Sequence, residues 1–331
     1  MRLFRLRNRR FMLDIMPLYG RPIVSALDTI GLPYSPVAMT YLDYARRGKN
    51  AFWRYLVTVL LAFVFAMVFI FALMLPPIAL HWVPKSIGID MQSPAHPLAF
   101  YGGLVLTFGT LLAGLIGAAA LIHKKNAGDI IGNWRWHLSA LGAAGWFGFT
   151  LLGLAIDYAL RPKGFSLTLG NLTPVVIVSA IIGIAVQTFA EEFIFRGYVT
   201  QGLLLATKRP WVAAILSGLI FGSVHIPNGW PQAANAVVFG VVMSLVAIRT
   251  GSLALSYGVH FINNLIGAIG IVSADDVFRG TPGILTQHTP DLLWLDTAVG
   301  AAGLIVLLVI VLKFTPKPDG STAIAADQYP K

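Results

Sequence analysis

The sequence predicts an all-α membrane protein, a polytopic bundle of about eight transmembrane helices. Of its 331 residues, 56% are hydrophobic and only 11% are charged, whereas a soluble domain carries about 25% charged residues. The mean hydropathy is +0.74. Apolar stretches recur along the chain at lengths close to the roughly 20 residues that a helix needs to cross a bilayer. These observations exclude a soluble globular protein.

Turn-forming residues divide the apolar sequence into separate segments. Pro76 and Pro77 close the first segment, a turn at 227–231 separates two short ones, and Thr250 with Gly251 forms a tight turn. The fourth segment is too long for a simple span. The predicted helices lie at 53–75, 99–122, 137–160, 173–206, 211–226, 232–248, 252–273 and 292–313.

The chain divides into five regions on this basis. A basic arm at its start is expected to lie in the cytoplasm or at the membrane interface, and Asp14, Pro17 and Arg21 interrupt any apolar core that a cleaved signal would need. Residues after the last helix are expected to be disordered. The regions are the arm (1–50), the N-terminal transmembrane helices (51–170), a helical core (171–272), the last transmembrane helix (273–316) and the tail (317–331).

Charge and cysteine content restrict the possible partners. The net charge is +10, but the basic residues flank apolar segments, which predicts membrane lipid and no nucleic acid as a partner. With eight spans the basic clusters share one side, so both termini are expected in the cytoplasm. We expect a multi-pass integral protein of a prokaryotic inner or plasma membrane. The chain has no cysteine, which excludes disulfides, thiolate nucleophiles and cysteine-ligated metals.

Glu191 and Glu192 are the only glutamates in the chain, and they end the long apolar run 175–190. A carboxylate in hydrocarbon is costly, so it usually faces a polar cavity or pairs with a cation. Arg196 follows Glu192 by four residues on one helix face, which predicts an ion pair. Glu191 points about 100° away from that face on a helix. Glu192 is therefore expected to be structural and Glu191 to be available for chemistry.

Two histidines lie inside apolar segments of the C-terminal half. His225 follows Phe221 by four residues, and His260 precedes Asn264 by four, so each pair shares a helix face. Singly, such residues have plainer explanations: helix contacts for the histidines, interhelical hydrogen bonds for Asn263 or Asn264, and packing for Phe221. Together with Glu191 they supply a base, hydrogen-bond donors and an oxyanion site.

The three motifs together resemble a known family. EEFIFR fits EExxxR, FGSVH fits FxxxH and HFINN fits HxxxN, in this order over about residues 171–272. The chain resembles the CAAX prenyl endopeptidase and bacteriocin-processing (CPBP or Abi) family of intramembrane proteases. The resemblance implies a membrane cavity open to the cytoplasm and a catalytic core at 171–272. It further implies that Glu191 with His225 activates water, that His260 and Asn264 stabilise the oxyanion, and that Glu192 and Arg196 hold the site together.

The function predicted from these residues is a CAAX-type intramembrane endopeptidase, acting on a membrane-associated peptide or protein that is prenylated or not. No cofactor is favoured, although Glu191, His225 and His260 could hold zinc in a metalloendopeptidase-like site. Two other classes stay open. One is a non-catalytic membrane scaffold or immunity-type binding protein that uses the same polar cavity. The other is a proton-coupled transporter, for which no inverted repeat is found.

Overall fold

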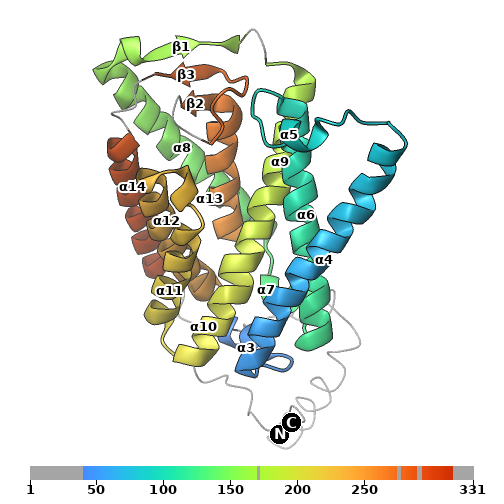
Figure 1. The fold of residues 1–331 in the computed structure, drawn as a ribbon. Helices are drawn as coiled ribbons and strands as arrows, with labels where there is room; N and C mark the ends of the chain where they lie inside the picture. The colour runs from blue at the N-terminus through green and yellow to red at the C-terminus, as the bar shows by residue number, and fades with distance from the viewer. Residues whose placement is uncertain (1–39, 170–171, 274–276, 289–292, 316–331) are drawn as a thin grey trace, which may run out of the picture. The chain divides into compact units, whose positions relative to one another are not determined.

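Apolar helices make up most of the fold in a computed structural model of the chain (Figure 1). The structure describes residues 40–169, 172–273, 277–288 and 293–315. Most of the basic arm, through residue 39, and the tail from residue 316 lie outside these residues, and so do the predictions made for them.

Most helices follow one another with short connections, and the longest, from η5 to α14, contains two strands. A π-helix, η3 (Glu192–Val199), joins α9 to α10, and a second, η5 (Ile266–Gly270), follows α13. Short 3₁₀ turns form at η1 (Pro162–Gly164) and η4 (Ile226–Asn228). The α-helices are α3 (Tyr41–Arg46), α4 (Phe52–Ala79), α5 (Ile87–Asp90), α6 (Pro97–Ile122), α7 (Ala127–Ile131), α8 (Trp136–Leu160), α9 (Pro174–Glu191), α10 (Thr200–Thr207), α11 (Pro210–Ser223), α12 (Trp230–Thr250), α13 (Ala254–Leu265) and α14 (Leu293–Phe314).

The prediction of a polytopic helical bundle is confirmed. Within the described residues, six helices are long and apolar enough to cross a membrane, the longest running unbroken from Pro174 to Thr207 through η3. The other two predicted segments form α11, of 14 residues, and α13, of 12 residues. The prolines predicted to end the first segment lie inside the last turns of α4, which continues to Ala79.

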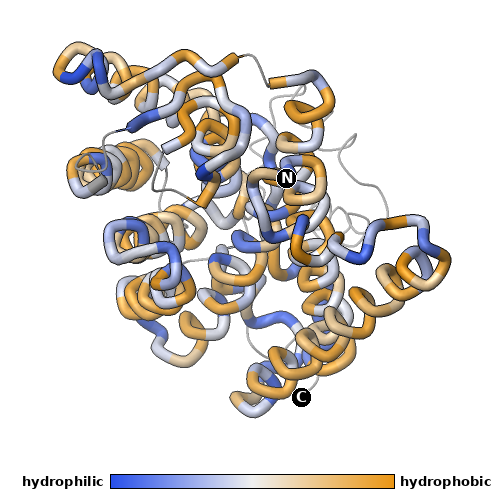
Figure 2. Tube along the Cα trace, turned by 45° about the horizontal axis from the view of Figure 1, so that its top comes forward, coloured by the Kyte–Doolittle hydropathy of each residue, from blue (hydrophilic) through white to orange (hydrophobic). Residues whose placement is uncertain are grey.

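The outer surface of the bundle is hydrophobic. In α4, α8 and α14, only 17% of the most apolar 18-residue window is buried inside the protein, and Figure 2 shows hydrophobic residues dominating the helices. Side chains this apolar are stable outside a core only where hydrocarbon replaces water. The protein is therefore a multi-pass integral membrane protein.

A small sheet that the sequence did not predict lies at one end of the bundle (Figure 1). Its strands β1 (Phe165–Leu167), β2 (Ile271–Ser273) and β3 (Leu285–Gln287) are ordered β1-β3-β2, with β1 antiparallel and β2 parallel to β3. The helix predicted to extend to residue 273 therefore ends at Gly270. The β-branched Ile271 and Val272 favour an extended backbone, but their pairing depends on a segment distant in sequence.

Helices α8 and α13 approach each other closely through glycine. A Cβ atom added at Gly258 would lie 2.0 Å from the Ser139 carbonyl oxygen, and one at Gly142 would lie 2.6 Å from the Leu255 carbonyl oxygen. Small residues at helix contacts allow this approach in membrane proteins. The contact matters for the site because α13 carries His260 and the asparagines.

Replacing Gly258 with Ala is expected to destabilise the protein by about 1–3 kcal/mol or more, because the new methyl group meets rigid backbone and the helices must separate. The measurement is the midpoint of thermal unfolding in detergent. Gly145→Ala on α8 is the matched control, since a Cβ there meets no atom within 4 Å. Equal midpoints for the two variants would contradict the close approach.

A polar cluster anchors α3 at the end of the bundle opposite the sheet (Figure 1). The Tyr41 hydroxyl, which is buried, donates to the carbonyl oxygen of Arg196 in η3. Arg47 forms an ion pair of 2.8 Å with Asp129. Lys125, buried in the loop after α6, donates from Nζ to the Ala45 carbonyl oxygen at 2.7 Å. The first contact couples the last residues of the arm to the helix that carries the glutamates, and the other two couple them to α7 and to the loop after α6.

Lys125 gives the stability of the protein a specific pH dependence. Burial lowers the pKa of Lys125 to about 8, with Asp129 opposing the shift, whereas a lysine in the unfolded chain titrates near about 10.4. Above pH 8 the unfolded chain therefore binds more protons at this site, and the free energy of unfolding rises with pH.

The expected result is that stability measured from about pH 8 to 9.5 rises more steeply in the wild type than in Lys125→Met. The difference between the two curves isolates this lysine from other titrating groups. Parallel curves would show that Lys125 is not desolvated in the folded protein.

Candidate functional site

A cavity of about 220 Å³ lies between the helices of the C-terminal half. Its lining includes the four predicted catalytic residues, namely Glu191, His225, His260 and Asn264. Another part of the wall is apolar and contains Phe100, Leu104, Phe108 and Phe278. The cavity therefore combines ionisable groups with a surface suited to apolar side chains or lipid.

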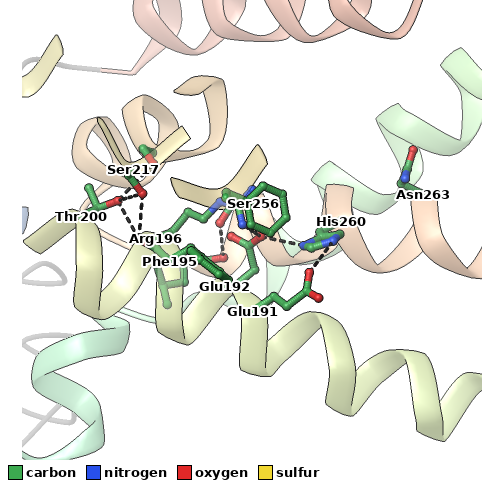
Figure 3. Close-up of polar contacts among 12 residues, drawn as sticks. Glu191, Glu192, Phe195, Arg196, Thr200, Ser217, Ser256, His260 and Asn263 are labelled. Carbon is green, nitrogen blue, oxygen red and sulfur yellow. Dashed lines mark hydrogen bonds and ion pairs between the residues drawn. The ribbon is translucent and has the colours of Figure 1, made fainter. Parts of the chain in front are cut away.

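The π-helix η3 begins at the second glutamate. Such segments recur at functional sites, and their i→i+5 hydrogen bonds replace the α-helical pattern. Side chains supply further donors to its carbonyl groups: Thr200 donates to the Phe195 oxygen at 2.8 Å, and Ser217 donates to the same atom at 3.1 Å. Figure 3 shows these hydroxyl groups grouped beside η3. Neighbouring helices thus hold the backbone that carries the glutamates.

Glu192 and Arg196 form the predicted ion pair. Arg196 Nη1 lies 3.3 Å from Glu192 Oε1, and both residues are fully buried. The guanidinium carbon lies 4.0 Å from the ring centroid of Phe221 and 5.1 Å from that of Phe239. The Glu192 carboxylate and the two rings surround the Arg196 guanidinium, whose nitrogens make no hydrogen bond among the described residues. Phe221 is therefore more than a packing residue, because it also stabilises the charge of Arg196.

His260 lies between the two glutamates (Figure 3). Its Nδ1 is 2.8 Å from Glu192 Oε1, and its Nε2 is 3.5 Å from Glu191 Oε2. A carboxylate only accepts, so the Nδ1 atom carries a proton in its contact with Glu192. Glu191, expected to lack a partner, therefore has His260 as its neighbour. Adjacent residues on a helix point apart, but an imidazole has two nitrogens and can face both carboxylates.

His225 lies in the turn between α11 and η4 and lines the same cavity. Its Nδ1 is 2.8 Å from the Phe221 carbonyl oxygen. Because a carbonyl only accepts, Nδ1 carries the proton in the neutral ring, and Nε2 retains its lone pair. This tautomer is suited to accepting a proton from water.

Asn264 belongs to a group of amides at the cavity. Its Nδ2 donates to Gln187 Oε1 at 3.1 Å and lies 3.3 Å from His260 Nε2. Its Oδ1 accepts from Asn263 at 3.1 Å, and the Trp146 indole donates to Asn263 Oδ1 at 3.0 Å. Sequence reasoning missed Gln187 and Trp146. The four-residue spacing of Gln187 from Glu191 was a usable signal, whereas no sequence pattern links Trp146 on α8 to this site.

The sequence left open a zinc site with Glu191, His225 and His260 as its ligands. Across the residues that the structure describes, no group of three or more His, Asp or Glu side chains is arranged to hold a metal ion. His260 presents one nitrogen to each glutamate, so its ring already has both nitrogens directed at other groups. The arrangement does not fit a three-ligand zinc site, and no step of the proposed reaction involves one.

The fold and cavity define a class: a multi-pass helical membrane protein with a buried carboxylate, histidine and amide cluster. Residues 171–266 match the family described as type II CAAX prenyl endopeptidase Rce1-like. The match to this Rce1-like family domain includes all three motifs, and the resemblance inferred from them is confirmed for residues 171–266.

Two curated relatives are similar over most of the chain. The uncharacterized protein YyaK of Bacillus subtilis (strain 168) is 26% identical over 268 residues, covering 75% of this chain and 87% of its own length. An ammonium transporter of Aquifex aeolicus (strain VF5) is 28% identical over 260 residues, which cover 72% of this chain but only 55% of that protein. No solved structure matches the chain.

Proposed function

We propose that this protein is an intramembrane endopeptidase whose catalytic core is residues 171–272. The observation that carries the proposal is that one cavity is lined by Glu191, His225, His260 and Asn264 together. The family domain at 171–266 supports the same activity. The proposed substrate is a membrane-associated peptide or protein. Its apolar part would contact the apolar part of the cavity wall, which contains Phe100, Phe108 and Phe278.

In the proposed reaction, a water molecule between Glu191 and His225 attacks the scissile carbonyl carbon. Glu191 takes a proton from the water, and the free Nε2 of His225 accepts a hydrogen bond from it and orients it. The new carbon–oxygen bond leaves a negative charge on the former carbonyl oxygen. The proton then passes to the leaving nitrogen as the carbonyl re-forms and the carbon–nitrogen bond breaks, giving a carboxylic acid and an amine, which ionise to a carboxylate and an ammonium group.

Asn264 Nδ2 and His260 are proposed to stabilise the oxyanion. Hydrogen-bond donors fixed before the reaction stabilise a developing charge without reorganisation. A hydrogen bond to Glu192 orients the His260 ring, and Glu192 is in turn paired with Arg196. Glu192 and Arg196 thus act as positioning residues in this proposal. We further propose that both termini are cytoplasmic, on the distribution of lysine and arginine.

The test is cleavage of a panel of fluorogenic peptides by purified protein in nanodiscs, with and without a strong chelator. The panel contains farnesylated peptides, the same peptides without the lipid, and transmembrane peptides. Cleavage that survives the chelator is expected. Activity lost to the chelator and restored by zinc would contradict the proposed water activation by Glu191 and His225 alone. The absence of any cleavage, with cellular function intact in a Glu191→Gln variant, would instead favour a scaffold or binding protein.

A further inference from the structure

We infer that Trp146 and Asn263 are positioning residues that set the orientation of the Asn264 side-chain amide at the cavity. The inference rests on the proposed function, in which Asn264 donates to the oxyanion. Trp146 lies on α8, outside the residues that match the family. Neither residue needs to touch a substrate for this role.

The hydrogen bonds that link Trp146, Asn263 and Asn264 can run in only one direction. An indole N–H group donates and cannot accept, so the Asn263 atom at 3.0 Å from Trp146 Nε1 must be the oxygen. The Asn263 nitrogen then faces Asn264, where it meets Oδ1 at 3.1 Å. Asn264 is consequently left with its NH₂ group directed at Gln187 Oε1, 3.1 Å away, and at His260.

This orientation matters because the two ends of an amide have nearly the same shape and opposite function. With Nδ2 on the side of Gln187 and His260, which both line the cavity, Asn264 has an N–H group that can turn to an oxyanion there. If the amide were reversed, its carbonyl oxygen would face the developing negative charge and repel it. A donor that is already oriented needs no reorganisation during the reaction. The Trp146 indole can only donate a hydrogen bond. It therefore excludes the reversed orientation of the Asn264 amide through Asn263.

Packing supports the arrangement independently of the hydrogen bonds. Trp146 is buried, and its ring packs against Phe149 with centroids 5.0 Å apart, which restricts the indole. The close contact of α8 with α13 at Gly142 and Gly258 brings the two helices near enough for the indole to reach Asn263. A helix outside the motifs thus takes part in building the site.

The first test needs no substrate. In protein labelled with ¹⁵N-asparagine in nanodiscs, the side-chain NH₂ signals of Asn264 are assigned by their loss in Asn264→Leu. Trp146→Phe is expected to shift these signals, because the indole donates to Asn263, which in turn donates to Asn264. Trp134→Phe is the matched control, because the buried Trp134 Nε1 makes no hydrogen bond among the described residues. Unchanged Asn264 signals in Trp146→Phe would overturn the inference.

The second test separates orientation from general damage to the fold. With the panel peptide that the wild type cleaves, Trp146→Phe is expected to lower kcat about 10-fold to 100-fold while KM stays the same, as for loss of an interaction made in the transition state. Trp134→Phe should keep both parameters. A rise in KM with kcat unchanged, or equal losses in the two variants, would overturn the positioning role.

The two tests also distinguish the failure of the inference from the failure of the proposed function. If no peptide is cleaved, the spectroscopic test still decides whether the indole orients the amide. If Glu191→Gln abolishes cleavage while Trp146→Phe leaves both kcat and the Asn264 signals unchanged, the peptidase assignment holds and the positioning role is overturned.

Discussion

Replacing Glu191 with Gln is expected to lower cleavage by about 10²–10⁴-fold, the usual contribution of a general base. Glutamine has nearly the same shape but cannot take the proton from water. The fold should survive, because the only ion pair of Glu191 among the described residues is the 3.5 Å contact with His260. The measurement is the rate of peptide cleavage together with the thermal unfolding midpoint.

Asp157→Asn is the matched control for this substitution, since it makes the same change of acid to amide in a membrane helix outside the cavity. It should cleave at the wild-type rate. Glu191→Gln activity equal to wild type would contradict the role of Glu191. Loss of a pH-driven flux in Glu191→Gln, with no cleavage product from the wild type, would instead identify a transporter.

Replacing Arg196 with Met is expected to destabilise the protein by about 3–5 kcal/mol, the usual result of removing one partner of a buried ion pair. The variant would leave the Glu192 carboxylate, which is 0% exposed, without its cation. It would also remove the cation over the Phe221 ring. Unfolding in detergent measures the effect.

The double variant Glu192→Gln/Arg196→Met tests whether the unpaired Glu192 carboxylate causes the loss of stability. It removes both charges, and Gln can still accept a hydrogen bond from His260. Most of the lost stability should return, because a buried pair can often be replaced by neutral residues at little cost. If the double variant is as unstable as Arg196→Met alone, the loss comes from packing around the guanidinium and not from the unpaired carboxylate.

Much of the fold followed from hydrophobic segments and turn residues. Eight helical segments were predicted, and α9 with η3 and α10 forms the long fourth one. The helical segments depend on nearby sequence, because a helix in a membrane must satisfy its own backbone hydrogen bonds. The sheet escaped prediction because Ile271 to Ser273 pairs with a strand that starts 14 residues later at Leu285.

Some features of the site likewise follow from local sequence, and others depend on how the helices pack. The pairing of Glu192 with Arg196 and the shared faces of His260 with Asn264 depend on helical spacing, which the sequence contains. The position of His260 between two glutamates depends on how α13 packs against α9 and η3. Local spacing cannot predict which ring nitrogen meets which carboxylate.

The sequence by itself determined the class of this protein, its helical segments and the residue types of its cavity, because bilayer thickness and helix periodicity act on short stretches of chain. Only the tertiary structure decided the partners of Glu191, the π-helix at η3 and the place of Trp146 in the amide chain. Those features depend on contacts between helices far apart in sequence. Their geometry depends on side-chain volumes at close approaches such as Gly258, and no local pattern encodes it.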